Sequence, residues 1–106
     1  MNKSYIYRHW NRAIERTEAL GKLGIPEEDF RYLIDMRLIG RYVVLKFNRL
    51  SKDPNGVDLI EHEWTRKIHA KTMLVNLGLT DRHGNLQAAW SFMGVVELRF
   101  TERIKG

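Results

Sequence analysis

The chain has 106 residues, of which 43% are apolar and 29% are charged, and its formal net charge is +5 at pH 7. This length and apolar content predict one domain with one hydrophobic core. The chain has no cysteine, which excludes disulfides, thiolate metal sites and cysteine nucleophiles and is typical of a reducing compartment such as the cytoplasm. No apolar run approaches the roughly 18 residues of a membrane span, so we expect no membrane partner. The positive charge favours nucleic acid or an acidic protein surface as the partner.

Large apolar residues and glycines recur in the chain at an offset of 54 residues. The matched pairs include Ile6 and Ile60, Trp10 and Trp64, Ile14 and Ile68, Leu20 and Leu74, Gly24 and Gly78, and Gly40 and Gly94. These are the positions that a shared backbone would fill alike. The pattern predicts a single domain, residues 1–106, made of two repeats at about 2–50 and 57–103. A Pro-Asn-Gly turn within residues 51–56 would join the repeats.

The first part of each repeat has apolar residues at three- to four-residue spacing, which predicts helices over residues 3–23 and 58–77. Gly24 and Gly78 stand where a helix commonly ends with a left-handed residue, and each is followed by an apolar residue that would pack back on the last turn. Trp10 and Trp64 lie on the apolar stripes of these helices, so we expect them to be core anchors.

After each of these glycines, apolar and polar residues alternate, which predicts strands. The inward side chains would be Phe30, Tyr32, Ile34, Met36, Leu38, Val43, Leu45 and Phe47 in the first repeat, and Leu86, Ala88, Trp90, Phe92, Val96, Leu98 and Phe100 in the second. Tight turns at Gly40 and Gly94 would close two hairpins, with Leu38 opposite Arg41 in the first hairpin. A local alternative is a helix that begins at Pro26.

The expected fold is therefore α+β, with a duplicated helix-strand-strand unit (αββαββ). Its four-stranded antiparallel sheet would carry two helices on one face. Such a sheet has two open edges, which would allow a homodimer. The alternative for the whole chain is an all-α helical bundle.

The uncovered face of this sheet is the predicted site, because its side chains are of the kinds that contact phosphates and base edges. The predicted nucleic-acid-binding residues are Arg31, Arg37, Arg41, Lys46, Asn48 and Arg99. A second basic surface would form on the outward sides of the helices, from Arg8, Arg12, Arg16, Lys22, Arg66, Lys67, His69 and Lys71.

Two motifs resemble known sites without completing them. His62 and Glu63 begin a helical zinc motif, but its second histidine position, four residues after the first, holds Arg66, which cannot bind zinc. The segment at residues 24–34 has the outline of a recognition helix, but Glu27 and two further acidic residues at its start would be repelled by DNA.

A third motif, "LGLTDRHGNL" at residues 77–86, resembles the signature of the LAGLIDADG homing endonucleases. Gly78, Leu79, Asp81 and Gly84 match its spacing, and Glu27 is the first-repeat equivalent of Asp81. The resemblance implies a metal-binding acidic residue after a helix that ends in glycine. Members of that family carry one such helix in each longer αββαββα domain, whereas here each short unit would carry one.

These observations lead to three hypotheses of function. The first is a non-enzymatic nucleic-acid-binding module that needs no cofactor and no metal, in which lysine and arginine neutralise phosphates. The second is a protein-binding adaptor or inhibitor, of the kind that mobile elements encode, which targets a nucleic-acid-handling protein. The third is a metal-dependent nuclease that uses Asp81 and Glu27. This hypothesis requires cleavage of nucleic acid in the presence of divalent ions, and we expect no such cleavage.

Overall fold

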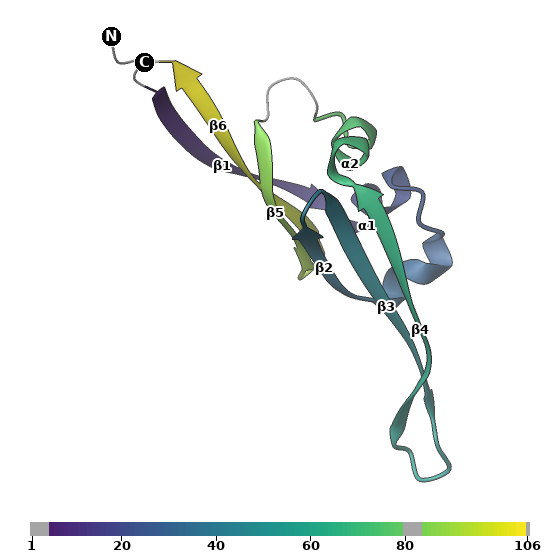
Figure 1. Ribbon diagram of the computed structural model, residues 1–106. Helices are drawn as coiled ribbons and strands as arrows, with labels where there is room; N and C mark the ends of the chain where they lie inside the picture. Colours follow the sequence, from purple (N-terminus) through teal and green to yellow (C-terminus); the bar gives the residue numbers. More distant parts are fainter. Residues whose placement is uncertain (1–4, 80–83, 106) are drawn as a thin grey trace.

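The computed structural model describes residues 5–79 and 84–105. In this part of the chain, six strands, two short α-helices and one 3-10 helix (η1) follow one another. Their order is β1 (Tyr5–Glu15), α1 (Arg16–Lys22), η1 (Glu27–Tyr32), β2 (Leu33–Ile39), β3 (Tyr42–Lys52), β4 (Asp58–His69), α2 (Ala70–Asn76), β5 (Asn85–Phe92) and β6 (Val95–Lys105). The strands form two antiparallel three-stranded sheets, ordered β1-β6-β5 and β2-β3-β4 (Figure 1).

The predicted αββαββ fold with a single four-stranded sheet is wrong, and so is the all-α alternative. Residues 3–23 and 58–77 were expected to be helices, but strands β1 and β4 occupy most of these segments. Only seven residues at the end of each segment are helical, in α1 and α2. Each half of the chain is therefore a strand-helix-strand-strand unit, with the 3-10 helix η1 added in the first half.

The four-residue spacing of Trp10 and Ile14 explains this error. Residues four apart share a face in a strand as well as in a helix, because four is an even number. Both side chains pack against the core from β1, as the helix would also have required. The aromatic and β-branched residues of Tyr5–Tyr7 favour the strand.

The first strand of each half pairs with the last strand of the other half. β1 lies along β6, with Trp10 opposite Phe100, and β4 lies along β3, with Trp64 opposite Phe47. The two halves also make matching backbone hydrogen bonds at the start of each helix. The Arg16 N–H donates to Gly94 O and the Ala70 N–H donates to Arg41 O, both at 2.8 Å. Neither sheet is built from one half alone.

The predicted helix ends at Gly24 and Gly78 are confirmed. Both glycines are left-handed, with φ of 80° and 72°. The Ile25 N–H donates to Leu20 O at 3.1 Å, and the Leu79 N–H donates to Leu74 O at 2.8 Å, which closes the last turn of each helix.

The hairpin turns also lie at the predicted glycines, but the register differs from the prediction. Leu38 pairs with Val43 instead of Arg41, a shift of two residues that leaves the same side chains on each face. A bulge between Leu33 and Asp35 then reverses the alternation, so Ile34 is exposed.

A matching bulge in β5 lies between Leu86 and Ala88. It turns Ala89 inward and places Trp90 opposite Glu97 on the outer face, so the inward direction predicted for Ala88, Trp90 and Phe92 is wrong. The segment before β2 differs too. Glu27–Tyr32 is a 3-10 helix, as the alternative with a helix from Pro26 had partly anticipated.

One hydrophobic core joins both sheets and both helices. The predicted inward faces of β3 and β6 are confirmed, because Val43, Leu45, Phe47, Val96, Leu98 and Phe100 are at most 1% exposed. Leu20 of α1 and Met73 of α2 cover this layer. Trp10 and Trp64 are half-buried against it instead of fully buried.

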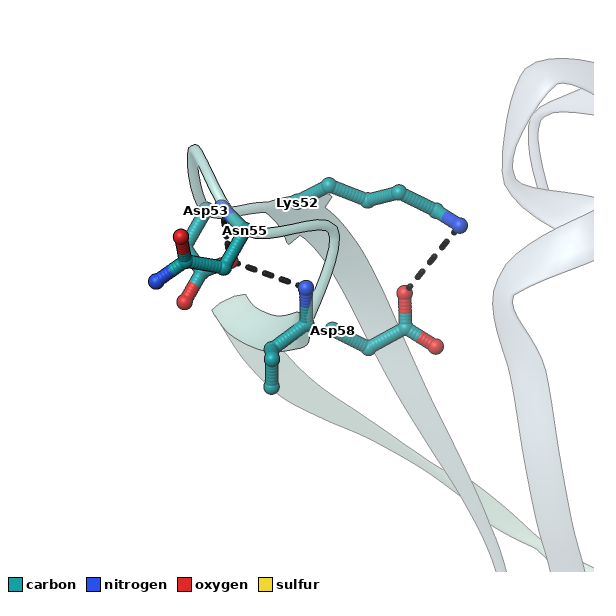
Figure 2. Close-up of polar contacts among 5 residues, drawn as sticks. Lys52, Asp53, Asn55 and Asp58 are labelled. Carbon is teal, nitrogen blue, oxygen red and sulfur yellow. Dashed lines mark hydrogen bonds and ion pairs between the residues drawn. The ribbon is translucent and has the colours of Figure 1, made fainter.

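Beyond the core, two ribbons extend in opposite directions and give the molecule a length of 72 Å against a width of 22 Å (Figure 1). The free ends of β1 and β6 form one ribbon, and the β3–β4 hairpin forms the other. At the hairpin tip, the Asp53 carboxylate accepts hydrogen bonds from the N–H groups of Asn55 (2.9 Å) and Val57 (2.8 Å), and Lys52 pairs with Asp58 at 3.9 Å (Figure 2). None of the helices in the described residues is long and apolar enough to cross a membrane.

Candidate nucleic-acid interface

The outer side of the β2-β3-β4 sheet carries a group of cations brought together by strand register. Arg37 lies opposite Val44, and Val44 lies opposite Lys67, so the three form one row across the sheet. In the next row, Lys46 lies between Asp35 and Thr65. These residues alternate with the buried side chains of the strands and therefore point away from the core.

We call this surface the basic face. It consists of Asp35, Arg37, Ile39, Tyr42, Val44, Lys46, Asn48, Glu63, Thr65, Lys67 and His69. Val44 is only 7% exposed although it lies on this side. The strands that carry these residues form the β2-β3-β4 sheet, from which the β3–β4 ribbon extends (Figure 1).

The cations of the basic face differ in how far they are neutralised. Arg37 forms an ion pair with Asp35 at 2.9 Å. Lys46 and Lys67 are exposed, and neither has a carboxylate within ion-pair distance among residues 5–79 and 84–105. Two positive charges are therefore available to an anion.

An aromatic pair marks one end of the basic face. Tyr42 is 47% exposed, and its ring meets the His69 ring edge to face, with 5.3 Å between centroids. The His69 Nδ1 accepts a hydrogen bond from the Lys71 N–H at 3.2 Å, so the neutral ring carries its proton on Nε2. An exposed ring beside cations provides a surface on which a nucleobase can stack.

The equivalent surface of the β1-β6-β5 sheet has a different charge. There, Trp90 occupies the place of Arg37, Ala13 that of Lys67, and Arg99 that of Lys46. Glu97 and Glu15 replace Val44 and His69. The basic face thus has three cations and two carboxylates, whereas its equivalent has one cation and two carboxylates over the same positions.

Arg99 is also engaged differently from Lys46. Its guanidinium lies 5.4 Å from the centre of the Trp90 ring, a cation–π contact within its own sheet. Arg103 makes a similar contact with the Tyr5 ring at 4.5 Å.

The structure brings together only some of the predicted site residues. Arg37, Lys46 and Asn48 share the basic face, and Arg41 lies in the turn at its end. Arg99 lies on the other sheet, because the four-stranded sheet that would have joined it to the rest does not exist. Arg31 lies in η1, with its guanidinium 4.8 Å from the centre of the Tyr32 ring.

The second basic surface, predicted on two helices, is also redistributed. Arg8 and Arg12 lie on β1, whereas Arg66, Lys67 and His69 lie on β4. The strand conformation of β4 is what brings Lys67 and His69 onto the same sheet as Lys46. Sequence reasoning did not assign Tyr42, Lys67 and His69 to the sheet face, because the apolar residues over 63–69, Trp64 and Ile68, fit a helix as well as a strand.

The described residues hold no cluster of three or more histidine and acidic side chains that could bind a metal. Glu27, one of the two acidic residues of the nuclease hypothesis, is exposed at the start of η1. The other, Asp81, lies outside the described residues.

Comparisons with protein-family models, with curated proteins and with solved structures find no match to this chain.

Proposed function

We propose that the protein is a non-enzymatic nucleic-acid-binding module that holds a single strand on the basic face. The observation that carries this proposal is the contrast between two equivalent surfaces of one molecule. The basic face combines the unpaired cations Lys46 and Lys67 with the exposed ring of Tyr42, whereas its equivalent is slightly acidic. A surface that served solubility alone would need no such difference.

The arrangement suits a single strand better than a duplex. Cations spaced along a sheet follow a phosphate backbone, and an exposed aromatic ring stacks on an unpaired base of any sequence. Asn48 and Thr65 add side chains that can donate to and accept from base edges. A cytoplasmic location, where single strands of RNA are abundant, agrees with the absence of cysteine.

The experiment measures the salt dependence of binding to a labelled single strand of mixed sequence, by fluorescence anisotropy between about 50 and 200 mM salt. For the parent protein, we expect affinity to fall steeply with salt. Replacing Arg37, Lys46 and Lys67 together by Ser should reduce the magnitude of the logarithmic slope by about 2, since each phosphate contact on a single strand contributes about 0.7.

Lys46→Ser and Arg99→Ser form a matched pair, because the two residues occupy equivalent positions on the two sheets. We expect Lys46→Ser to weaken binding and lower the slope, and Arg99→Ser to change neither. Equal effects of the two substitutions, or a parent protein that binds no strand, would refute the proposal. With Mg²⁺ added, we expect the bound strand to remain intact.

A protein-binding adaptor is the second candidate, favoured by the β3–β4 ribbon. Its exposed apolar side chains are Leu50, Val57, Leu59 and Ile60, each about half exposed. If the parent protein binds no nucleic acid but captures a cellular protein in stoichiometric amounts, this candidate replaces the first. Replacing Leu50 and Ile60 by Ser should then abolish the capture.

A further inference from the structure

An open cleft of about 740 Å³ lies where the basic face ends. It is bounded by the β2–β3 turn, the start of α2 and the start of β5. Its described lining includes Leu38, Arg41, His69, Lys71, Leu74 and Leu86. His69 belongs to both the cleft and the basic face, so the two are continuous.

The side chain at the start of the helix differs between the two halves, and Ala70 holds this position at the cleft. Its equivalent in the first half is Arg16, as the matching backbone hydrogen bonds at the two helix starts show. The Arg16 guanidinium donates to Phe30 O at 3.2 Å and to Leu33 O at 3.0 Å, and so bridges from its helix to the following strand. Leu86 is the equivalent of Leu33, and no side chain at position 70 reaches across to it.

The described lining of the cleft has a consistent chemistry. Arg41, His69 and Lys71 supply cationic or hydrogen-bond-donating groups, and the described lining contains no aspartate or glutamate. Leu38, Leu74 and Leu86 supply an apolar wall. A ligand that matches both parts has a flat aromatic ring, whose faces can contact the leucines, and a phosphate group. The volume is within the range of roughly 300–1,000 Å³ that is usual for small-molecule sites.

We propose that this cleft binds the terminal, phosphate-bearing nucleotide of a single strand that lies on the basic face. The proposal rests on the proposed function and adds to it a preference for a strand end. The terminal base contacts the leucines, while Arg41 and Lys71 hold the terminal phosphate. The Nε2–H of His69 is available to the same phosphate, because its Nδ1 is already occupied by the Lys71 N–H.

The test compares three oligonucleotides of one sequence and about ten nucleotides, within the usual site size of such proteins. One carries a 5′-phosphate, one a 3′-phosphate, and one has hydroxyl groups at both ends. We expect one of the two phosphorylated strands to bind about tenfold more tightly than the hydroxyl strand, as charge-assisted hydrogen bonds imply. The free mononucleotide is tested separately, and should bind more weakly than the strand because it lacks the contacts of the basic face.

Two variants introduce, at positions of the cleft, the residues that stand at the equivalent positions of the first half. Ala70→Arg fills the cleft, and Lys71→Thr introduces the residue of the equivalent position, Thr17. Both should abolish the preference for the phosphorylated end while binding of the hydroxyl strand persists. Lys22→Thr, which removes a cation from α1 away from the cleft, should retain the preference.

The outcomes separate this inference from the proposed function. If the parent protein binds all three strands equally, or if Lys71→Thr retains the preference, the inference is wrong and the proposed function stands. If the parent protein binds none of the strands, both are wrong. Circular dichroism checks the fold of each variant. If Ala70→Arg does not fold, Lys71→Thr, an exposed position, decides the result.

Discussion

The indole ring of Trp64 lies parallel to the ring of Phe47, with 5.2 Å between their centroids and 5° between their planes. The same relationship joins Trp10 to Phe100, at 4.7 Å and 23°. In both cases the tryptophan is on an outer strand and the phenylalanine is in the core. Each stack fastens the first strand of one half to the last strand of the other half.

Trp64→Ala should therefore lower the free energy of unfolding by about 3 kcal/mol, the lower end of the range for a large aromatic residue, because the side chain is only half-buried. Urea denaturation followed by circular dichroism measures the change. His62→Ala is the control, since His62 stacks on Trp64 at 5.0 Å but is exposed. It should cost less than about 0.5 kcal/mol. Similar costs for both substitutions would contradict a structural role for the Trp64–Phe47 stack.

Tyr42→Ala should weaken binding of a single strand about tenfold, because stacking on an aromatic side chain contributes roughly 1–3 kcal/mol per base. Tyr42→Phe keeps the ring and should bind like the parent protein. Tyr7 is the control, since it is exposed on the other sheet and Tyr7→Ala should have no effect on binding. Fluorescence anisotropy at constant salt measures all three. An unchanged affinity of Tyr42→Ala would remove the stacking contact from the proposed interface.

Gly84→Ala should destabilise the protein more than Gly56→Ala. Both glycines have positive φ, 59° and 80°, so a side chain at either position strains the backbone. At Gly84, an added Cβ would also lie 2.9 Å from the Glu102 Cα, whereas no atom lies within 4 Å at Gly56. We expect about 1 kcal/mol for Gly56→Ala and at least about 2 kcal/mol for Gly84→Ala, measured by thermal unfolding. Equal losses would mean that β6 moves away from residue 84 at no cost.

Met93→Asn should stabilise the protein by about 1 kcal/mol. Met93 has φ of 46° and lies with Gly94, φ 86°, in a two-residue hairpin turn that favours Asn-Gly. Its side chain is 92% exposed, so the substitution removes no packing. Thermal unfolding measures the gain. A lower midpoint for Met93→Asn would show that the methionine side chain makes a contact that its exposure does not suggest.

The parts of the fold that sequence patterns predicted correctly are those with a single physical explanation. Gly24 and Gly78 end helices because a left-handed residue is required there, and Gly40 and Gly94 close hairpins for a similar reason. Val43 and Val96 begin the inward faces of β3 and β6. Each of these strands is paired on both sides, and its alternation of apolar and polar residues fits only a strand with one buried face.

The errors arose where one pattern fits two structures. The spacing of Trp64 and Ile68 suits both a helix and a strand, and only pairing with β3 decides between them. The bulges at Ile34 and Gln87 reverse the alternation without any signal in local composition.

Residues of the candidate site were placed correctly where their strands were predicted correctly, and wrongly where a strand was predicted to be a helix. Arg37 and Lys46 were assigned to one face correctly, because they lie on strands of one hairpin. Lys67 and His69 were placed on a helix, and so their proximity to Lys46 was missed. The cleft beside Ala70 was not predicted, because the contacts that Arg16 makes at the equivalent place are visible only in the folded structure.

The pairing of β1 with β6 has a consequence for how the chain folds during its synthesis. Arg8 and Glu102, which form an ion pair at 2.9 Å, are 94 residues apart in sequence. The sheet β1-β6-β5 therefore forms only after the last strand has left the ribosome, whereas the sheet β2-β3-β4 can form earlier from neighbouring segments. Until β6 is available, the segment of β1 that contains Tyr5, Ile6 and Tyr7 has no partner strand, and an unpaired apolar strand of this kind is open to pairing with another chain.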